Sequence, residues 1–346
     1  MDSASYNSKE KMFAMEVWIH HLLIRVGIFF FLLLFAQEVQ SQGLRRLRVT
    51  YSSFSPEQAM AYVTKEARLF EKNGLDVELI QVRGALSAAA LVAREVYIAQ
   101  MAGPAVVQAT LAGSDVVMVA GLVNRPDFSL VAPKSIRGPE DLRGKKVAVS
   151  RFGGSSDFMT RLALRRLGLE PEKDVTILQV GGSAERLVAM RAGAIHGAVL
   201  TTGEKLNALR QGFHELLDLT RIDYPYQHTG VATTRSFIRS EEETLRNFMR
   251  AYVEGIHIYK TQRDFTISAL RKFLRIDDAG LLRETYDAYF QKFPRAPYPT
   301  VEGIRNILTE LSARLPTART ATPADFIEPR FVKELDESGF IGRLYR

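Results

Sequence analysis

Short apolar runs alternate with helix-length segments along most of the chain. The runs Leu47–Tyr51 and Leu75–Leu79 predict strands, and between them apolar side chains recur at helical spacing up to a glycine. Ser55, Pro56 and Gln58 are the residue types of a helix start with a capping box. The order strand, helix, strand predicts a β-α-β unit, so we expect a largely parallel sheet.

The same alternation continues and then starts afresh near the middle of the chain. Strands are expected at Val96–Ala99 and Val116–Leu122, and a second series places them at Lys145–Ser150, Val175–Val180 and His196–Leu200. Loops rich in glycine and small polar residues follow several of these strands and lead into helices. Two comparable α/β lobes are the simplest prediction from this pattern.

The last third of the chain has a helical pattern, with helices expected at Phe265–Leu274, Ala279–Phe293 and Val301–Arg314. Two crossing strands near Arg125–Val131 and His228–Thr233 would form a hinge between the lobes. With one return crossing, the helical tail would pack on the first lobe. The predicted lobes comprise residues 42–127 plus 230–346 and residues 128–229.

The N-terminal segment differs in character from the remainder. Lys9, Lys11 and Arg25 precede an unbroken apolar run over Val26–Ala36, and small residues follow it. This order is typical of a secretory signal. The run has eleven residues, whereas a membrane-spanning helix needs about 20. We therefore expect residues 1–41 to be a cleaved signal peptide and the mature protein to be periplasmic, with a retained membrane anchor as the weaker alternative.

Composition narrows the function classes. Of 346 residues, 46% are hydrophobic and 25% charged, as in a globular protein of about two domains. The chain contains no cysteine, so it has no disulfide, no thiolate nucleophile and no cysteine that could carry a lipid anchor. Its formal net charge of +7 comes from scattered basic residues. Such a field favours anionic ligands, but the absence of a basic run does not support nucleic-acid binding.

Sequence motifs of enzymes are missing. The chain has neither G-x-G-x-x-G nor G-x-S-x-G, and its histidines do not show the spacing of a metal site. We therefore predict no catalytic residue, no cofactor and no metal.

Small and polar residues cluster at the predicted C-terminal ends of the strands, which is where open α/β sheets bind ligands. The segment Gly153–Ser156 is the sharpest example, because glycines admit a ligand close to the backbone and a helix start attracts anions. Ser155 or Ser156 would also cap the helix that follows. Arg151 and Arg83 could pair with a carboxylate or sulfonate, and Tyr226 and His228 could close over a ligand. The predicted ligand-binding residues are Ser52, Ser53, Gly84, Gly103, Arg151, Gly154, Ser155, Ser156, Ser183, Thr201, Thr202 and Tyr226.

Several segments of the chain resemble a known family. The resemblance rests on "EARLFEKNGLDVELIQV" at 66–82, the glycine at 103, "DLRGKKVAVSRFGGSS" at 141–156, "LVAMRAGAIHGAVLT" at 187–201 and "TPADFIEPRFVKELDESGFI" at 322–341. In these segments the chain is similar to solute-binding proteins of ABC transporters with the type II periplasmic-binding fold. The similar branch binds sulfonates and taurine, nitrate, or pyrimidine precursors of thiamine.

The resemblance implies two hinged lobes, a ligand in the cleft between them and closure on binding. It departs from the family at Tyr97 and at His196–Gly197, where an acidic residue is common. The implied function is uptake of a small organic solute, with an anion among the candidates, permease subunits as partners and a monomeric state. The alternatives are a thiamine-pyrimidine-synthase-like enzyme, whose cysteine-rich iron motif the chain lacks, and a membrane-anchored sensor domain.

Overall fold

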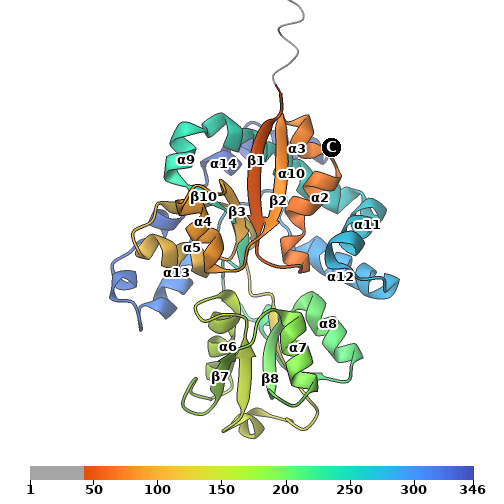
Figure 1. Ribbon diagram of the computed structural model, residues 1–346, viewed down its shortest axis with the longest axis vertical. Helices are drawn as coiled ribbons and strands as arrows, with labels where there is room; N and C mark the ends of the chain where they lie inside the picture. Colours follow the sequence, from red (N-terminus) through yellow and green to blue (C-terminus); the bar gives the residue numbers. More distant parts are fainter. Residues whose placement is uncertain (1–42) are drawn as a thin grey trace, which may run out of the picture. The chain divides into compact units, whose positions relative to one another are not determined.

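Two five-stranded sheets organise the residues that the computed structural model describes, residues 43–346 (Figure 1). The predicted signal peptide, residues 1–41, lies outside the described residues. The sheet of the first lobe has the order β2-β1-β3-β10-β4, and that of the second lobe the order β7-β6-β8-β5-β9. The strands are β1 Arg45–Tyr51, β2 Leu75–Gln81, β3 Ile98–Met101, β4 Val116–Val123, β5 Phe128–Ala132, β6 Lys146–Val149, β7 Thr176–Gln179, β8 Gly197–Thr201, β9 His214–Asp218 and β10 Thr229–Thr234.

Four strands of each sheet run in one direction, as the β-α-β pattern predicted, and one strand of each runs against them. β10 pairs antiparallel with β3 and β4, and β5 pairs antiparallel with β8 and β9. These two strands come from the segments predicted only as hinge crossings. The chain crosses between the sheets at residues 124–127 and 222–228, beside the positions predicted. All residues of Phe128–Ala132 are buried, because the chain enters the second sheet as β5 directly after the first crossing.

The helices of the two lobes lie near the predicted positions, but the first one is broken. Ser55 makes no capping bond, and the segment divides into η1, α2 and α3, with Arg68 in the left-handed region at φ 54° between the last two. The side chain of Gln58 instead accepts a hydrogen bond from the Ser52 N–H at 3.1 Å. The helices are η1 Pro56–Gln58, α2 Met60–Glu66, α3 Leu69–Lys72, α4 Ala85–Val92, α5 Gly103–Leu111, η2 Pro139–Leu142, α6 Ser155–Arg166, α7 Ser183–Arg191, α8 Thr202–Arg210 and η3 Leu219–Arg221.

The C-terminal tail is helical, as the pattern predicted. Its elements are α9 Arg235–Ser240, α10 Glu242–Thr261, α11 Arg263–Leu274, α12 Ala279–Lys292, α13 Val301–Leu311, η4 Pro316–Arg319, η5 Pro323–Phe326, α14 Arg330–Glu337 and α15 Phe340–Leu344. The long helix α10 buries Phe248 and Tyr252 in the core of the first lobe. Helix α13 differs, because its Ile304 and Ile307 belong to a core cluster that includes Phe158 of the second lobe. The tail therefore also braces the second lobe.

The core explains why the apolar runs become strands. Every residue of β4 is buried, and so is every residue of β10 beside it. Burying one valine or leucine side chain contributes roughly 1.5–3 kcal/mol. A strand covered on both faces therefore gains most when it is apolar throughout, as Val116–Val123 is. Among the described residues, no helix is both long and apolar enough to cross a membrane.

Candidate functional site

A cavity of about 1350 Å³ lies between the two lobes and is lined by residues of both. Its walls are built by loops and helix starts that follow β1, β2, β6, β7 and β8, the sheet edge at which the sequence predicted a site. Nine predicted residues line this cavity: Ser52, Ser53, Gly84, Arg151, Gly154, Ser155, Ser156, Ser183 and Thr201. The structure therefore brings these residues together, and that they bind a ligand stays a prediction.

Three predicted residues do not line the cavity. The Gly103 N–H donates to the Gln227 carbonyl at 3.1 Å, and a Cβ on Gly103 would lie 2.4 Å from that oxygen. This glycine thus admits the return crossing and not a ligand. Thr202 donates to Asp127 at 2.6 Å, and Tyr226 is fully buried, with its hydroxyl donating to Ser155 at 3.1 Å. These two side chains support the walls from behind.

The start of α6 differs from the prediction in its hydrogen bonding. Neither Ser155 nor Ser156 caps the helix, and Gly154 occupies the N-cap position. Ser156 is occupied elsewhere, because its hydroxyl accepts the Ser150 N–H at 2.8 Å. Asp157 caps the loop instead by accepting the Gly153 N–H at 2.9 Å. This carboxylate already compensates part of the helix dipole, which weakens the helix start as an anion site.

Three charged side chains that the sequence analysis did not select form the polar floor of the cavity, namely Glu57, Arg186 and Glu204. Glu57 and Arg186 are 4% and 3% exposed, which is rare for charged residues. Arg186 donates to the Ser183 hydroxyl at 2.7 Å, so the neighbouring loop holds its guanidinium in place. Each of the three lies in or beside a helix start, where charged residues are usually exposed to solvent.

Burial sets the protonation of this floor. It raises the pKa of Glu57 to about 7, and the nearby Asp127 carboxylate adds to that increase. The pKa of Glu204 is raised well above its usual value by burial and then by Glu57. Burial lowers the pKa of Arg186 to about 10 and that of His228 to about 4. At neutral pH the floor therefore presents a charged guanidinium and carboxyl groups that are neutral more often than those of ordinary glutamates, and the nearby imidazole of His228 is neutral.

Several buried polar atoms of residues that line the cavity have no hydrogen-bond partner among residues 43–346. They are Ser114 Oγ, Arg186 Nη1, Thr201 Oγ1, Glu204 Oε2, both ring nitrogens of His228 and Thr229 Oγ1. Leaving a buried polar group unsatisfied costs about 1–3 kcal/mol, so such groups are rare in folded proteins. These atoms are concentrated in residues around one cavity, so its wall is where the described residues most lack polar partners.

A buried ionic network links the first crossing to both lobes behind the cavity. Lys292 of α12 pairs with Asp127 and also contacts the Thr202 hydroxyl at the start of α8. Tyr289 donates to the same aspartate and to Glu57, the latter at 3.4 Å. Asp127 is completely buried. This network ties the position of α8 to that of α12.

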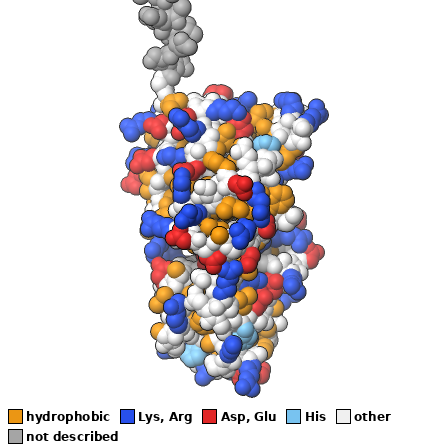
Figure 2. Space-filling model, turned by 90° about the vertical axis from the view of Figure 1, so that its right-hand side faces the viewer, with side chains coloured by type: hydrophobic (Ala, Val, Ile, Leu, Met, Phe, Trp, Pro, Cys, Tyr) orange, Lys and Arg blue, Asp and Glu red, His pale blue; other side chains and the backbone are white. Residues whose placement is uncertain are grey.

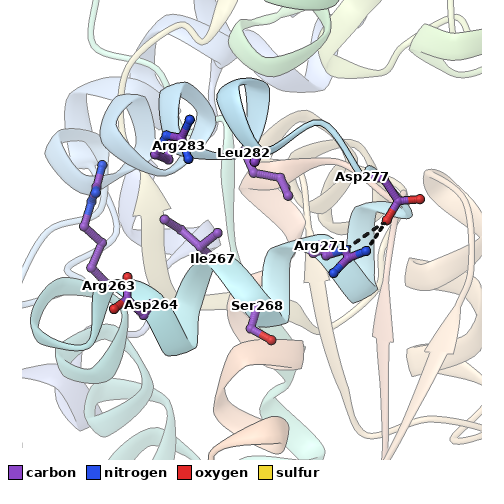
Figure 3. A pocket seen from close by; sticks show the side chains of 9 residues that line it. Arg263, Asp264, Ile267, Ser268, Arg271, Asp277, Leu282 and Arg283 are labelled. Atoms are coloured by element: carbon purple, nitrogen blue, oxygen red, sulfur yellow. Dashed lines mark hydrogen bonds and ion pairs between the residues drawn. The ribbon is translucent and has the colours of Figure 1, made fainter.

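A second, smaller hollow of about 400 Å³ lies between α11 and α12 (Figure 3). Arg271 and Asp277 pair across 2.8 Å at one end of it, and Arg263 pairs with Asp287 at 3.2 Å. These groups satisfy one another at the surface, so the hollow presents no comparable set of unpartnered atoms. Within residues 43–346, no group of acidic or histidine side chains is placed to hold a metal ion.

Two α/β lobes with two crossings and a polar cavity between them are the architecture of the periplasmic-binding-protein fold. The chain belongs to the NMT1/THI5 like family, whose model matches residues 55–263. A curated Haemophilus influenzae protein named for thiamine biosynthesis is 32% identical over 148 residues. Those residues are 42% of this chain and 46% of that protein, so the chain spans less than half the length of this relative.

Solved structures share the fold at low sequence identity. The alkanesulfonate-binding protein of Xanthomonas axonopodis bound to MOPS has a TM-score of 0.69 at 16% identity, covering 84% of this chain and all of that one. The nitrate-binding protein of Synechocystis has a TM-score of 0.66 at 15% identity, covering 85% and 89%. The aliphatic sulphonate binding protein of Escherichia coli has a TM-score of 0.63 at 19% identity, covering 80% of this chain and 86% of that one.

Proposed function

We propose that this protein is the solute-binding component of an ABC uptake transporter and holds a small organic solute between its lobes. The observation that carries the proposal is the inter-lobe cavity with its unpartnered polar atoms. In a binding protein, the polar groups that hold the ligand lack hydrogen-bond partners until the ligand binds. The wall of this cavity contains polar groups of that kind. The shared fold of ABC-importer binding proteins supports the same function.

The site favours binding over catalysis. Its polar groups come from separate elements, and the described contacts include no nucleophile paired with a base in the manner of a triad. The pyrimidine-synthase alternative is supported by the names of the family and of the Haemophilus relative, but its iron-binding cysteines have no counterpart in this cysteine-free sequence. We therefore propose a non-enzymatic role.

The proposed setting is the periplasm, with permease subunits as partners and a monomer as the working state. The charged side chains of the face drawn in Figure 2 are of both signs and interspersed. This distribution suits a protein that remains free in its compartment and docks transiently. Sequencing the N-terminus of protein recovered from the producing cell tests the setting, because export by signal cleavage would remove residues 1–41.

A thermal-shift screen of organic anions, amines and nucleobase-like heterocycles tests the binding function, with small-angle scattering to detect domain closure. The matched variants are Ala89→Trp, which fills an exposed cavity position, and Val188→Trp, which alters an exposed helix position outside the cavity. We expect a stabilising solute to lose its effect with Ala89→Trp alone. If no compound stabilises the unaltered protein, or if both variants bind equally well, the proposed cavity is wrong.

A further inference from the structure

The two lobes meet where α8 of the second lobe lies against η1 and α12 of the first, a contact that we call the seam (Figure 1). Gly203 of α8 approaches so closely that a Cβ on it would lie 2.8 Å from Pro56 Cγ and 3.9 Å from Thr285 Cγ2. A glycine admits this approach without displacing the proline ring. The structure therefore holds the seam closed, with no room for a side chain at position 203.

Polar contacts hold the seam at both of its ends. Arg210 of α8 pairs with Asp278, just before α12, at 2.7 Å and with Glu284 of α12 at 2.8 Å. At the inner end, Lys292 of α12 contacts the Thr202 hydroxyl at the start of α8. All three contacts join one lobe to the other, so they are lost if α8 moves away from α12.

Two carboxyl groups from opposite lobes line the cavity beside the seam. Glu57 and Glu204 each directly follow one of the two residues at the point of closest approach. Glu57 is 4% exposed, and Glu204 Oε2 is buried without a hydrogen-bond partner among residues 43–346. Asp127 adds a third carboxyl group, because Tyr289 donates to it and, at 3.4 Å, to Glu57. Like charges held this close oppose one another's ionisation, so the closed seam favours a proton on the pair.

We propose that the seam is a proton-operated latch: the lobes stay closed while Glu57 and Glu204 share at least one proton, and they part more readily once both are ionised. When α8 moves away from η1, the distance between the two carboxyl groups grows and water reaches them, so both ionise at lower cost. This inference goes beyond the proposed function, because it concerns the movement of the lobes whichever solute the cavity takes.

The pKa shifts in the closed seam agree with this direction. The pKa of Glu204 is raised well above its usual value by burial and then by Glu57 of the other lobe. Burial and then Asp127 raise the pKa of Glu57 to about 7. A carboxyl group whose pKa is higher in the closed form binds its proton more tightly there, so protons favour closure at acid pH. That advantage is lost as the pH rises from the ordinary pKa of a glutamate toward about 7.

Other titratable groups surround the two acids. Burial lowers the pKa of His228 to about 4, so its imidazole stays neutral between pH 5 and pH 8. Burial lowers the pKa of Arg186 to about 10, so its guanidinium stays charged. A pH response in this range is therefore assigned to Glu57 and Glu204. The charged and titratable groups that face them are Asp127 of the first crossing, Tyr289 and Lys292 of α12, Arg186 and Glu185 of α7, and His228 of the return crossing.

Double electron–electron resonance on the solute-free full chain measures how far the lobes are apart. The chain has no cysteine, so two introduced cysteines take spin labels selectively. Glu95→Cys after α4 and Val188→Cys on α7 place one label on an exposed position of each lobe. These helices line the cavity from opposite lobes, so opening increases the distance between the labels.

We expect the ratio of the short-distance to the long-distance population to fall at least about tenfold from pH 5 to pH 8. A carboxyl pKa of about 7 in the closed form and about 4.3 in the open form would change this ratio by roughly seventyfold. The smaller figure applies if Glu57 keeps part of its burial in the open form.

Glutamine variants assign the response to the two acids. Glu57→Gln combined with Glu204→Gln removes both titrating groups at nearly constant size, so the ratio should change less than about twofold between the two pH values. Glu185→Gln is the matched control, because Glu185 also pairs across the lobes, with Arg83 at 3.5 Å, but is 48% exposed. Its response should equal that of the unaltered protein. Circular dichroism establishes that each variant is folded, and Glu204→Gln alone replaces the double variant if that one is not.

Three results would overturn this inference: an equal ratio at pH 5 and pH 8, a ratio that rises with pH, or an unchanged pH response in the glutamine variant. None of them affects the proposed function, which depends on whether a solute binds in the cavity. If no solute binds there, the labels still report the latch, so the two failures are distinguishable.

Discussion

Replacing Lys292 by methionine would remove the cation of the buried network behind the cavity. Asp127 is 0% exposed and Lys292 21% exposed, so water cannot fully replace the lost partner. Removing one partner of a buried ion pair costs about 3–5 kcal/mol because the other charge remains buried. Asp127 would keep its hydrogen bonds from Tyr289 and Thr202, and Lys292 is partly solvated. We therefore expect Lys292→Met to lower the free energy of unfolding by about 2–4 kcal/mol.

Urea denaturation followed by circular dichroism measures this loss. The matched control is Lys272→Met, since Lys272 pairs with Glu66 at 2.7 Å while being 59% exposed. Exposed pairs are worth about 0–1 kcal/mol, so this control should change little. The double variant Asp127→Asn with Lys292→Met removes the orphaned charge and should recover at least about half of the loss.

Two outcomes would refute the reasoning. Lys292→Met and Lys272→Met could have the same effect, in which case the buried setting of Asp127 adds nothing to the cost. Alternatively, Asp127→Asn could fail to recover stability in the double variant. The loss would then come from packing of the lysine stem and not from an uncompensated carboxylate.

Three further predictions concern the core and the cavity wall. Gly230→Ala places a Cβ 2.1 Å from the Ala120 carbonyl oxygen, so we expect a loss of at least about 1–3 kcal/mol in urea unfolding, whereas Gly138→Ala, with open space around it, should stay within about 0.5 kcal/mol. Because the pKa of Glu57 is raised to about 7 in the folded protein, the folded state loses stability as pH rises from the ordinary pKa of a glutamate toward about 7. Glu57→Gln should therefore raise the melting temperature more at pH 8 than at pH 5. An equal change at both pH values would contradict this. Tyr226→Phe removes one hydrogen bond but keeps the packed ring, so its cost should be about 1 kcal/mol by urea unfolding, and a loss above about 3 kcal/mol would show that the hydroxyl supports more than Ser155.

Local sequence patterns predicted the helices and strands well where apolar periodicity alone indicates the conformation. β1, β4 and the helices α11 to α13 lie where apolar periodicity placed them. β5 and β10 were predicted only as hinge strands, because their membership of the two sheets depends on pairing with strands distant in the sequence. The absence of a capping bond at Ser55 has a local origin instead, since its hydroxyl contacts the nearby Glu57 carboxyl group and not a backbone N–H.

The sequence by itself determined the fold class, the doubled α/β pattern and the loops that line the cavity, because small residues after apolar strands are a local signal. It did not reveal that Glu57, Arg186 and Glu204 form the floor. Each stands in or beside a helix start, where charge is ordinary, and only the folded chain brings all three to the wall of one cavity. Burial and mutual proximity then change their protonation, and both depend on residues far apart in the chain. The tertiary structure therefore decided the chemistry of the site, while the sequence decided where along the chain that site would be built.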